Sequence, residues 1–81
     1  MRPKYFLYLL LCKDKSIYTG ITTDVRRRFA EHKAGTASKY TRAKKAVKIL
    51  YTERFATRSK ASKREAEVKK LERKQKLALY Q

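Results

Sequence analysis

An arginine and a histidine on one predicted helix are the first residues of this 81-residue sequence whose spacing suggests chemistry. Arg28 and His32 are four residues apart, so on a helix they project to neighbouring positions. A guanidinium beside an imidazole suits phosphate binding through charge-assisted hydrogen bonds, together with proton transfer. The same pair is also expected on an ordinary exposed polar edge of a helix.

Two tyrosines occur in neighbouring segments that are typical of paired strands. In an antiparallel hairpin the numbers of partner residues have a constant sum. A three-residue loop at 13–15 would therefore place Tyr8 and Tyr18 on one face of the sheet, together with Leu10 and Gly20. A free tyrosine has a pKa near ~10 and needs help to accept a proton. On spacing alone, both residues are interpreted as ordinary strand aromatics.

A glutamate interrupts the apolar stripe of a long predicted helix. Glu65 shares this stripe with Ala61, Val68 and either Leu71 or Glu72. A carboxylate facing a core is costly unless it is paired with a cation or coordinates a metal. A metal ligand is one interpretation, and a rim residue paired with a surface Lys or Arg is the other.

A basic, partly aromatic segment lies between these residues, since no acidic residue occurs from Lys33 to Thr52. Such a segment suits contact with a phosphate backbone and stacking on bases, although a solvated charged loop has the same composition. A second basic stretch, 58–76, follows on the long helix. The residues that we expect to bind nucleic acid are Lys39, Tyr40, Arg42, Lys44, Lys45 and Lys48.

The overall charge restricts the class of partner. The chain has 23 Lys and Arg against 7 Asp and Glu, a formal net charge of +16 with histidine neutral. This charge implies a polyanionic partner, with nucleic acid ahead of an anionic membrane, or else a generally solvated basic surface. The longest apolar run, 6–12, is far shorter than the roughly 20 residues of a membrane span. It also lacks a signal-peptide cleavage site, so we expect a cytoplasmic location.

The single cysteine, Cys12, excludes an intramolecular disulfide and a zinc site built from several cysteines. Its apolar neighbours predict a reduced packing residue. Nothing in the sequence marks an interface with a second copy or with another protein.

Hydrophobic patterns predict the strands that must position the site. We expect strands over 5–12 and 17–21, joined by a polar turn at 13–16. Apolar residues at alternate positions predict a third strand after residue 46. These positions are Val47, Ile49 and Tyr51.

Capping residues and 3.6-residue periodicity predict the helices. A helix is expected over 24–34, with capping residues at 22–24 and Gly35 as its stop. One short helix fits within 36–45, and a long helix begins after a cap at Thr57 or Ser59. After a break near Lys74 the apolar face continues at Leu77, Leu79 and Tyr80.

The resulting order is β-β-α-α-β-α-α. It predicts an α+β fold in which a small three-stranded antiparallel sheet is flanked by helices. A length of 81 residues supports one domain spanning 1–81.

In this order and spacing, the chain resembles a GIY-YIG nuclease domain from about Tyr5 to Tyr80. The first strand motif corresponds to Phe6-Leu7-Tyr8 and the second to Tyr18-Thr19-Gly20. Their tyrosines are ten residues apart, as in the family. Segments 17–24 and 39–42 are similar to the small stand-alone bacterial members.

The resemblance extends to the remaining candidate residues. Arg28 corresponds to the helix arginine of the family, His32 to a family histidine and Glu65 to the metal-binding glutamate. The sequence contains no asparagine, which many members carry after this glutamate. Ile21 follows Gly20 where the repair endonuclease of the family has a lysine.

The resemblance implies hydrolysis of a phosphodiester bond with one Mg²⁺ or Mn²⁺ ion. Glu65 would hold the metal and Arg28 the phosphate, with Tyr8 or Tyr18 as general base and His32 as a proton relay. The expected substrate is DNA recognised by its structure, because no separate recognition domain is evident. The alternatives are a catalytically silent nucleic-acid-binding module or accessory subunit, and a small RNA-binding or ribosome-associated protein.

Overall fold

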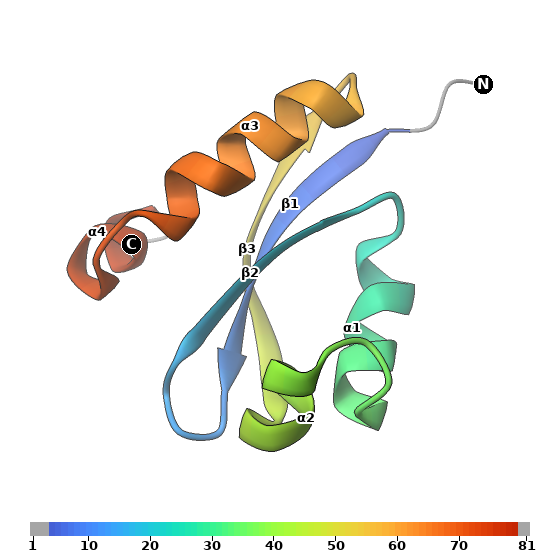
Figure 1. Ribbon diagram of the computed structural model, residues 1–81, viewed down its shortest axis with the longest axis vertical. Helices are drawn as coiled ribbons and strands as arrows, with labels where there is room; N and C mark the ends of the chain where they lie inside the picture. Colours follow the sequence, from blue (N-terminus) through green and yellow to red (C-terminus); the bar gives the residue numbers. More distant parts are fainter. Residues whose placement is uncertain (1–3, 80–81) are drawn as a thin grey trace.

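The computed structural model describes residues 4–79 and confirms the predicted α+β fold and the predicted order of its elements (Figure 1). The elements in chain order are β1 (Tyr5–Cys12), β2 (Ile17–Thr22), α1 (Val25–Ala34), α2 (Lys39–Lys44), β3 (Ala46–Phe55), α3 (Arg58–Lys69) and α4 (Arg73–Ala78).

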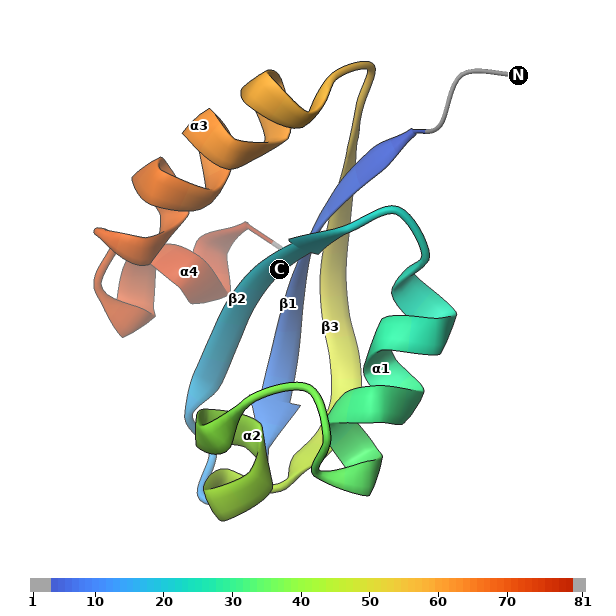
Figure 2. The same cartoon turned by 45° about the vertical axis from the view of Figure 1, so that its right-hand side comes forward.

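The sheet has the strand order β2-β1-β3, and β1 pairs antiparallel with both neighbours. Helices α1 and α2 lie on one side of the sheet, and α3 and α4 on the other (Figures 1 and 2). The central strand is therefore covered on both faces. This explains why its sequence is an apolar run without polar alternation.

The β1–β2 hairpin has the register that the sequence predicts. Tyr8 pairs with Gly20 and Leu10 with Tyr18. The Cys12 amide donates to the Ser16 carbonyl at 2.9 Å, which closes a loop of three residues. Tyr8 and Tyr18 therefore share one face of the sheet.

Two small cores form, one on each face. On the α1 side, buried Tyr8 and Leu10 pack against Val25 and Phe29. On the α3 side, Leu7 and Leu9 pack against Val68 of α3 and against apolar residues of β2, β3 and the segments that flank α4. Buried Cys12 carries a free thiol.

A bulge in β3 changes the face of its apolar residues. Leu9 pairs with Tyr51 but Leu10 pairs with Ile49, so Leu50 is an extra residue in the ladder. Ile49 consequently packs on the α1 side and Tyr51 on the α3 side. Val47 is 48% exposed. The alternation predicted the strand correctly, but its three residues do not form one buried row.

The ends of α1 are close to those predicted. Asp24 is the N-cap, and its side chain accepts a hydrogen bond from the Arg27 amide at 3.0 Å. Gly35 ends the helix with a φ of 81°, in the left-handed region that favours glycine. At the start of α3, Thr57 is the N-cap in place of Ser59.

The break in the C-terminal helical region was predicted too late. Helix α3 ends at Lys69 and α4 begins at Arg73, so the chain turns before Lys74. The turn is fixed by a capping box in which the Glu72 amide donates to Gln75 Oε1 at 2.9 Å. Leu71 packs on the core and Glu72 is exposed, whereas the predicted apolar residue Tyr80 lies outside the described residues.

Candidate active site

A tyrosine–histidine pair occupies the sheet face under α1. Tyr8 Oη lies 2.8 Å from His32 Nε2, and His32 Nδ1 lies 2.6 Å from Thr41 Oγ1. The ring of Tyr18 packs on that of His32 with centroids 4.8 Å apart. Strands β1 and β2 and helices α1 and α2 thus each supply a side chain to one cluster.

His32 is completely buried, so the alternative of an ordinary exposed polar edge is wrong for this residue. Both ring nitrogens have hydrogen-bond partners, which removes the main cost of burying an imidazole. Burial lowers the pKa of His32 below its ordinary value, and the positive charge of Arg28 lowers it further. The imidazole is therefore neutral at pH 7 and can accept a proton.

The Tyr8 hydroxyl lies in the interior between His32 and Gly20. Burial raises the pKa of Tyr8 to about 12, an effect that the neighbouring Arg28 opposes. Electrostatic interactions with the nearby Tyr18 and Glu65 raise the pKa of Tyr8 further. Tyr8 therefore remains protonated at neutral pH and requires an acceptor such as His32 before it can take another proton.

Arg28 lies at the border between this cluster and solvent. Its guanidinium forms an ion pair with Glu31 at 3.0 Å and donates to the Ala37 carbonyl at 3.5 Å. The side chain is 35% exposed. Glu31 thus holds a guanidinium that can also reach a phosphate. No pattern in the sequence pointed to Glu31.

Glu65 comes from α3, the helix on the other side of the sheet, which contacts the edge strand β2 as well as β1. Its side chain is 22% exposed, and one carboxylate oxygen lies 3.5 Å from Lys69 Nζ. The rim ion pair considered from sequence is therefore present. The Glu65 carboxylate nevertheless raises the pKa of Tyr8, so the two side chains are close enough to interact electrostatically.

The donor set around Glu65 fits one kind of metal. Within residues 4–79 there is no group of three or more His, Cys, Asp or Glu side chains that could enclose an ion. His32 is not available as a ligand because both nitrogens are hydrogen-bonded. A single, partly exposed carboxylate suits Mg²⁺ or Mn²⁺, which keep waters and take further oxygens from substrate phosphates.

A polar clamp fixes α3 to β3. Arg64 donates to Glu53 through Nε at 2.9 Å and through a terminal nitrogen at 3.2 Å, and Tyr51 donates to the same carboxylate. Burial raises the pKa of Glu53, but the hydrogen bonds from Arg64 and Tyr51 outweigh it and the net pKa is lowered. Arg64 immediately precedes Glu65 on α3, so the clamp orients the helical turn that carries Glu65.

The six predicted nucleic-acid-binding residues lie together on α2 and at the start of β3, and all six are exposed. Tyr40 is 40% exposed, and its ring packs on Tyr18 with centroids 5.7 Å apart. Tyr18 in turn packs on His32. The aromatic row therefore runs from the exposed surface of α2 to the buried cluster.

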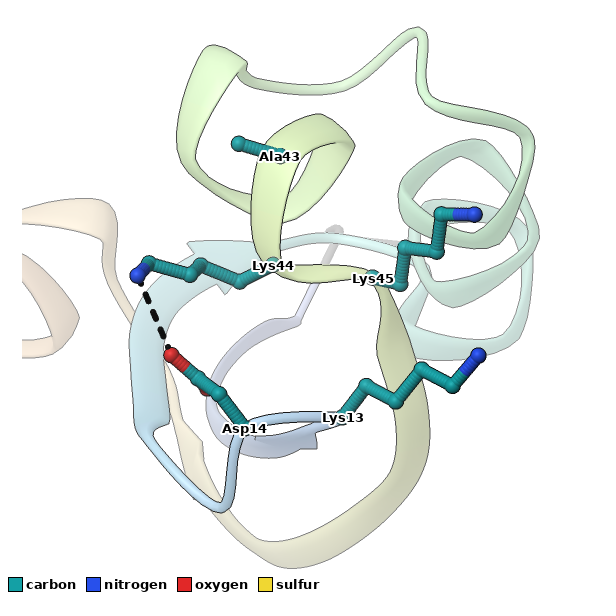
Figure 3. Close-up of a pocket in the computed structure, with 5 residues that line it drawn as sticks. All are labelled: Lys13, Asp14, Ala43, Lys44 and Lys45. Carbon is teal, nitrogen blue, oxygen red and sulfur yellow. Dashed lines mark ion pairs between the residues drawn. The ribbon is translucent and has the colours of Figure 1, made fainter.

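A hollow of about 350 Å³ lies where the β1–β2 turn meets the end of α2 (Figure 3). The Lys13 amide donates to the carbonyls of Lys44 and Lys45, which joins the two segments. Lys44 points toward Asp14 and pairs with it at 3.1 Å, while Lys13 and Lys45 extend together on the other side (Figure 3). Lys13 was not predicted, because only the tertiary structure brings the turn to α2.

Gly20 and Thr41 were also not assigned roles from the sequence. A Cβ on Gly20 would lie 2.5 Å from Tyr8 Oη, so the glycine provides the space that the hydroxyl occupies. Thr41 is 1% exposed although its helix is otherwise polar and exposed. In the sequence, Thr41 was marked only as part of the segment 39–42, which is similar to the small stand-alone family members.

The arrangement has a counterpart among known protein families. The family model of the GIY-YIG catalytic domain matches residues 4–78. This chain belongs to the GIY-YIG family. The match includes both strand motifs and the helices that carry Arg28, His32 and Glu65, and it places the chain in a family of nucleases.

Relatives support the same assignment. The UPF0213 protein H16_B0156 of Cupriavidus necator is 55% identical over 74 residues, covering 91% of this chain and 80% of the relative. Such relatives are small stand-alone members of the family.

Two solution NMR structures share the fold. That of the UPF0213 protein BH0048 from Bacillus halodurans is 42% identical with a TM-score of 0.60, covering 94% of this chain and 81% of the other. That of the protein EF2693 from E. faecalis is 52% identical with a TM-score of 0.62, covering 90% of this chain and 78% of the other.

In residues 4–79 of this GIY-YIG protein, no helix combines the length and apolarity needed to cross a membrane.

Proposed function

We propose that this GIY-YIG protein is a divalent-metal-dependent nuclease that hydrolyses phosphodiester bonds in DNA, directed by DNA structure and not by sequence. The observation that carries the proposal is the hydrogen bond between Tyr8 Oη and the neutral imidazole of His32, at 2.8 Å. Arg28 lies beside this pair and Glu65 acts on it electrostatically. A module that only binds nucleic acid gains nothing from burying such a pair.

Arg28 holds the scissile phosphate. Its guanidinium is one third exposed and is already oriented by Glu31, so it can make charge-assisted hydrogen bonds to phosphate oxygens. Arg28 lowers the pKa of Tyr8, so its guanidinium is close to the Tyr8 hydroxyl. A phosphate bound to Arg28 would therefore lie next to Tyr8. The guanidinium stabilises the negative charge that develops on the phosphate as water attacks.

Tyr8 and His32 together serve as the proton acceptor. Water gives its proton to the Tyr8 oxygen while the Tyr8 proton passes to His32 Nε2, so that hydroxide adds to phosphorus and the imidazole becomes an imidazolium. The P–O bond to the leaving strand then breaks, and the departing oxygen takes a proton from solvent. This route avoids a free phenolate, which a pKa of about 12 makes unfavourable at neutral pH. Tyr18 packs against the imidazole and fixes its orientation.

Glu65 would hold the Mg²⁺ or Mn²⁺ ion, which when bound supplies Lewis-acid stabilisation of the phosphate and the leaving oxygen. In the structure the carboxylate is paired with the Lys69 ammonium at 3.5 Å, a contact that a bound cation would replace. No other carboxylate is required, since waters and substrate oxygens complete the coordination of such ions.

The exposed basic residues of α2 and β3 bind the DNA backbone. Contacts of this kind follow the position of phosphates and carry no sequence information. Tyr40 adds a stacking surface for an unpaired base at the entrance to the site. An aromatic platform of this kind favours branched, flapped or single-stranded DNA over continuous duplex.

The test is cleavage of labelled duplex, single-stranded, flap and branched DNA in the presence of Mg²⁺, Mn²⁺ or EDTA. We expect metal-dependent cleavage of structured DNA by the wild type. Cleavage should be lost in Glu65→Gln and Arg28→Ala while DNA binding by Glu65→Gln is retained. Labelled RNA of the same shapes is included to test the choice of DNA.

The competing function is a catalytically silent nucleic-acid-binding module that recruits another nuclease. Binding without cleavage for every substrate and metal, unchanged by Glu65→Gln, would establish that function instead. Cleavage of random duplex at one defined sequence would contradict the structure-directed specificity proposed here.

A further inference from the structure

The imidazole of His32 has a second hydrogen bond on the side away from Tyr8. Its Nδ1 atom lies 2.6 Å from Thr41 Oγ1, and the imidazole is completely buried. A neutral imidazole carries one N–H, and the partner of one nitrogen determines which nitrogen is protonated. The hydroxyl at Nδ1 therefore decides whether Nε2 can accept a proton from Tyr8.

Thr41 is itself held in place by the cap of α2. Its amide donates to Ser38 Oγ at 3.1 Å, and the two hydroxyl oxygens are 2.9 Å apart. The Ser38 carbonyl lies 3.5 Å from the Thr41 hydroxyl. Thr41 can direct its own proton toward Ser38, and its Oγ1 atom then presents lone pairs that can accept a proton from His32 Nδ1.

Thr41 is also the member of α2 that is buried. It is 1% exposed, whereas Lys39, Tyr40 and Arg42 beside it are exposed. The short helix therefore attaches to the cluster through this side chain. A buried hydroxyl on a polar helix is costly unless it is hydrogen-bonded, and its bonds here go to His32 and Ser38.

We propose that Thr41 is a positioning residue that keeps His32 in the tautomer protonated at Nδ1, so that Nε2 is free to accept the proton of Tyr8. Its role in catalysis rests on the proposed nuclease function, whereas its effect on the tautomer does not. In the other tautomer, Nε2–H would donate to Tyr8 Oη and the transfer of a proton to His32 would be blocked.

The tautomer can be measured directly because His32 is the one histidine of the sequence. In protein labelled with ¹⁵N-histidine, the two ring nitrogen shifts distinguish Nδ1–H, Nε2–H and the imidazolium. The variants are Thr41→Val, which keeps the shape and removes the hydroxyl, and Thr41→Ser, which keeps the hydroxyl. Tyr8→Phe removes the partner on the other nitrogen.

We expect the Nδ1–H signature in the wild type, in Thr41→Ser and in Tyr8→Phe. In Thr41→Val the signature should shift to Nε2–H or to an average of the two tautomers. An unchanged Nδ1–H signature in Thr41→Val would overturn the proposal, as would Nε2–H in the wild type. If Thr41→Val fails to fold, the Tyr8→Phe spectrum tests the proposal in its place. Loss of the Nδ1–H signature in Tyr8→Phe would show that Tyr8, and not Thr41, controls the tautomer, and would overturn the proposal.

Cleavage assays then separate this inference from the proposed function. We expect kcat of Thr41→Val to fall about 10- to 100-fold with KM for DNA unchanged, and Thr41→Ser to recover most of the rate. A wild type that never cleaves but has the Nδ1–H signature refutes the nuclease and leaves the positioning role intact. A shifted signature with an unchanged kcat overturns the catalytic part of the inference.

Discussion

The hydroxyl of Tyr8 occupies the space above Gly20, its partner across the hairpin. A Cβ on Gly20 would lie 2.5 Å from Tyr8 Oη and 2.6 Å from Cζ, closer than such atoms can approach. The hydroxyl is held there by His32. The glycine of the second strand motif is therefore required by the tyrosine of the first.

We predict that Gly20→Ala destabilises the protein by about 1–3 kcal/mol, because the methyl group overpacks a buried site. Urea unfolding measures the change. In a Tyr8→Ala background the clash is absent, and Gly20→Ala should then cost close to nothing. An equal cost in both backgrounds would show that the glycine serves the backbone and not the tyrosine.

The buried imidazole should make stability depend on pH. Burial, with a contribution from Arg28 and against that of Glu31, lowers the pKa of His32 below 6.5 in the folded state. The unfolded chain therefore takes up a proton at higher pH, so this contribution to stability is complete above about pH 6.5 and is lost as the pH falls through the folded pKa.

The same pKa is accessible by NMR, since one imidazole gives one titration curve. We expect its midpoint below 6.5, and we expect Arg28→Gln to move it upward only in part, because burial is the larger cause. The pH dependence of unfolding near neutrality should disappear in His32→Gln. A midpoint at or above 6.5 in the wild type would contradict the buried, neutral imidazole.

The clamp between Glu53 and Arg64 should contribute to the stability of α3. We expect Arg64→Met to cost about 1–2 kcal/mol in urea unfolding, since a bidentate pair that is 30% and 20% exposed is only partly screened by solvent. Glu53→Gln in the same background should then add little.

The ion pair of Arg64 with Glu67 provides a matched control. Its atoms are 3.7 Å apart and Glu67 is 66% exposed, so Glu67→Gln should change stability by less than about 0.5 kcal/mol. If Glu67→Gln costs as much as Arg64→Met, the stabilisation arises within the helix and not from the contact with β3.

DNA affinity should fall steeply with salt, in keeping with the charge of +16. Lys13→Ala and Lys45→Ala should each reduce the slope of log K against log salt by about 1, if each lysine contacts one phosphate. Fluorescence anisotropy with flap DNA provides the measurement. Lys4→Ala, at the opposite end of β1 from Lys13, should leave the slope nearly unchanged, and an equal effect there would show that only net charge matters.

The sequence by itself determined the strands, the helices and the face shared by Tyr8 and Tyr18. These features are local, because the side-chain period of a strand and the capping groups of a helix depend on neighbours within a few residues. The three-residue loop fixed the hairpin register in the same way.

Only the tertiary structure decided the surroundings of these residues. The bulge at Leu50 sends Ile49 and Tyr51 to opposite faces of the sheet. The burial of His32 against Thr41 depends on how α1 and α2 pack together. Burial and hydrogen-bond partners depend on elements distant in the sequence, which periodicity and capping patterns do not specify.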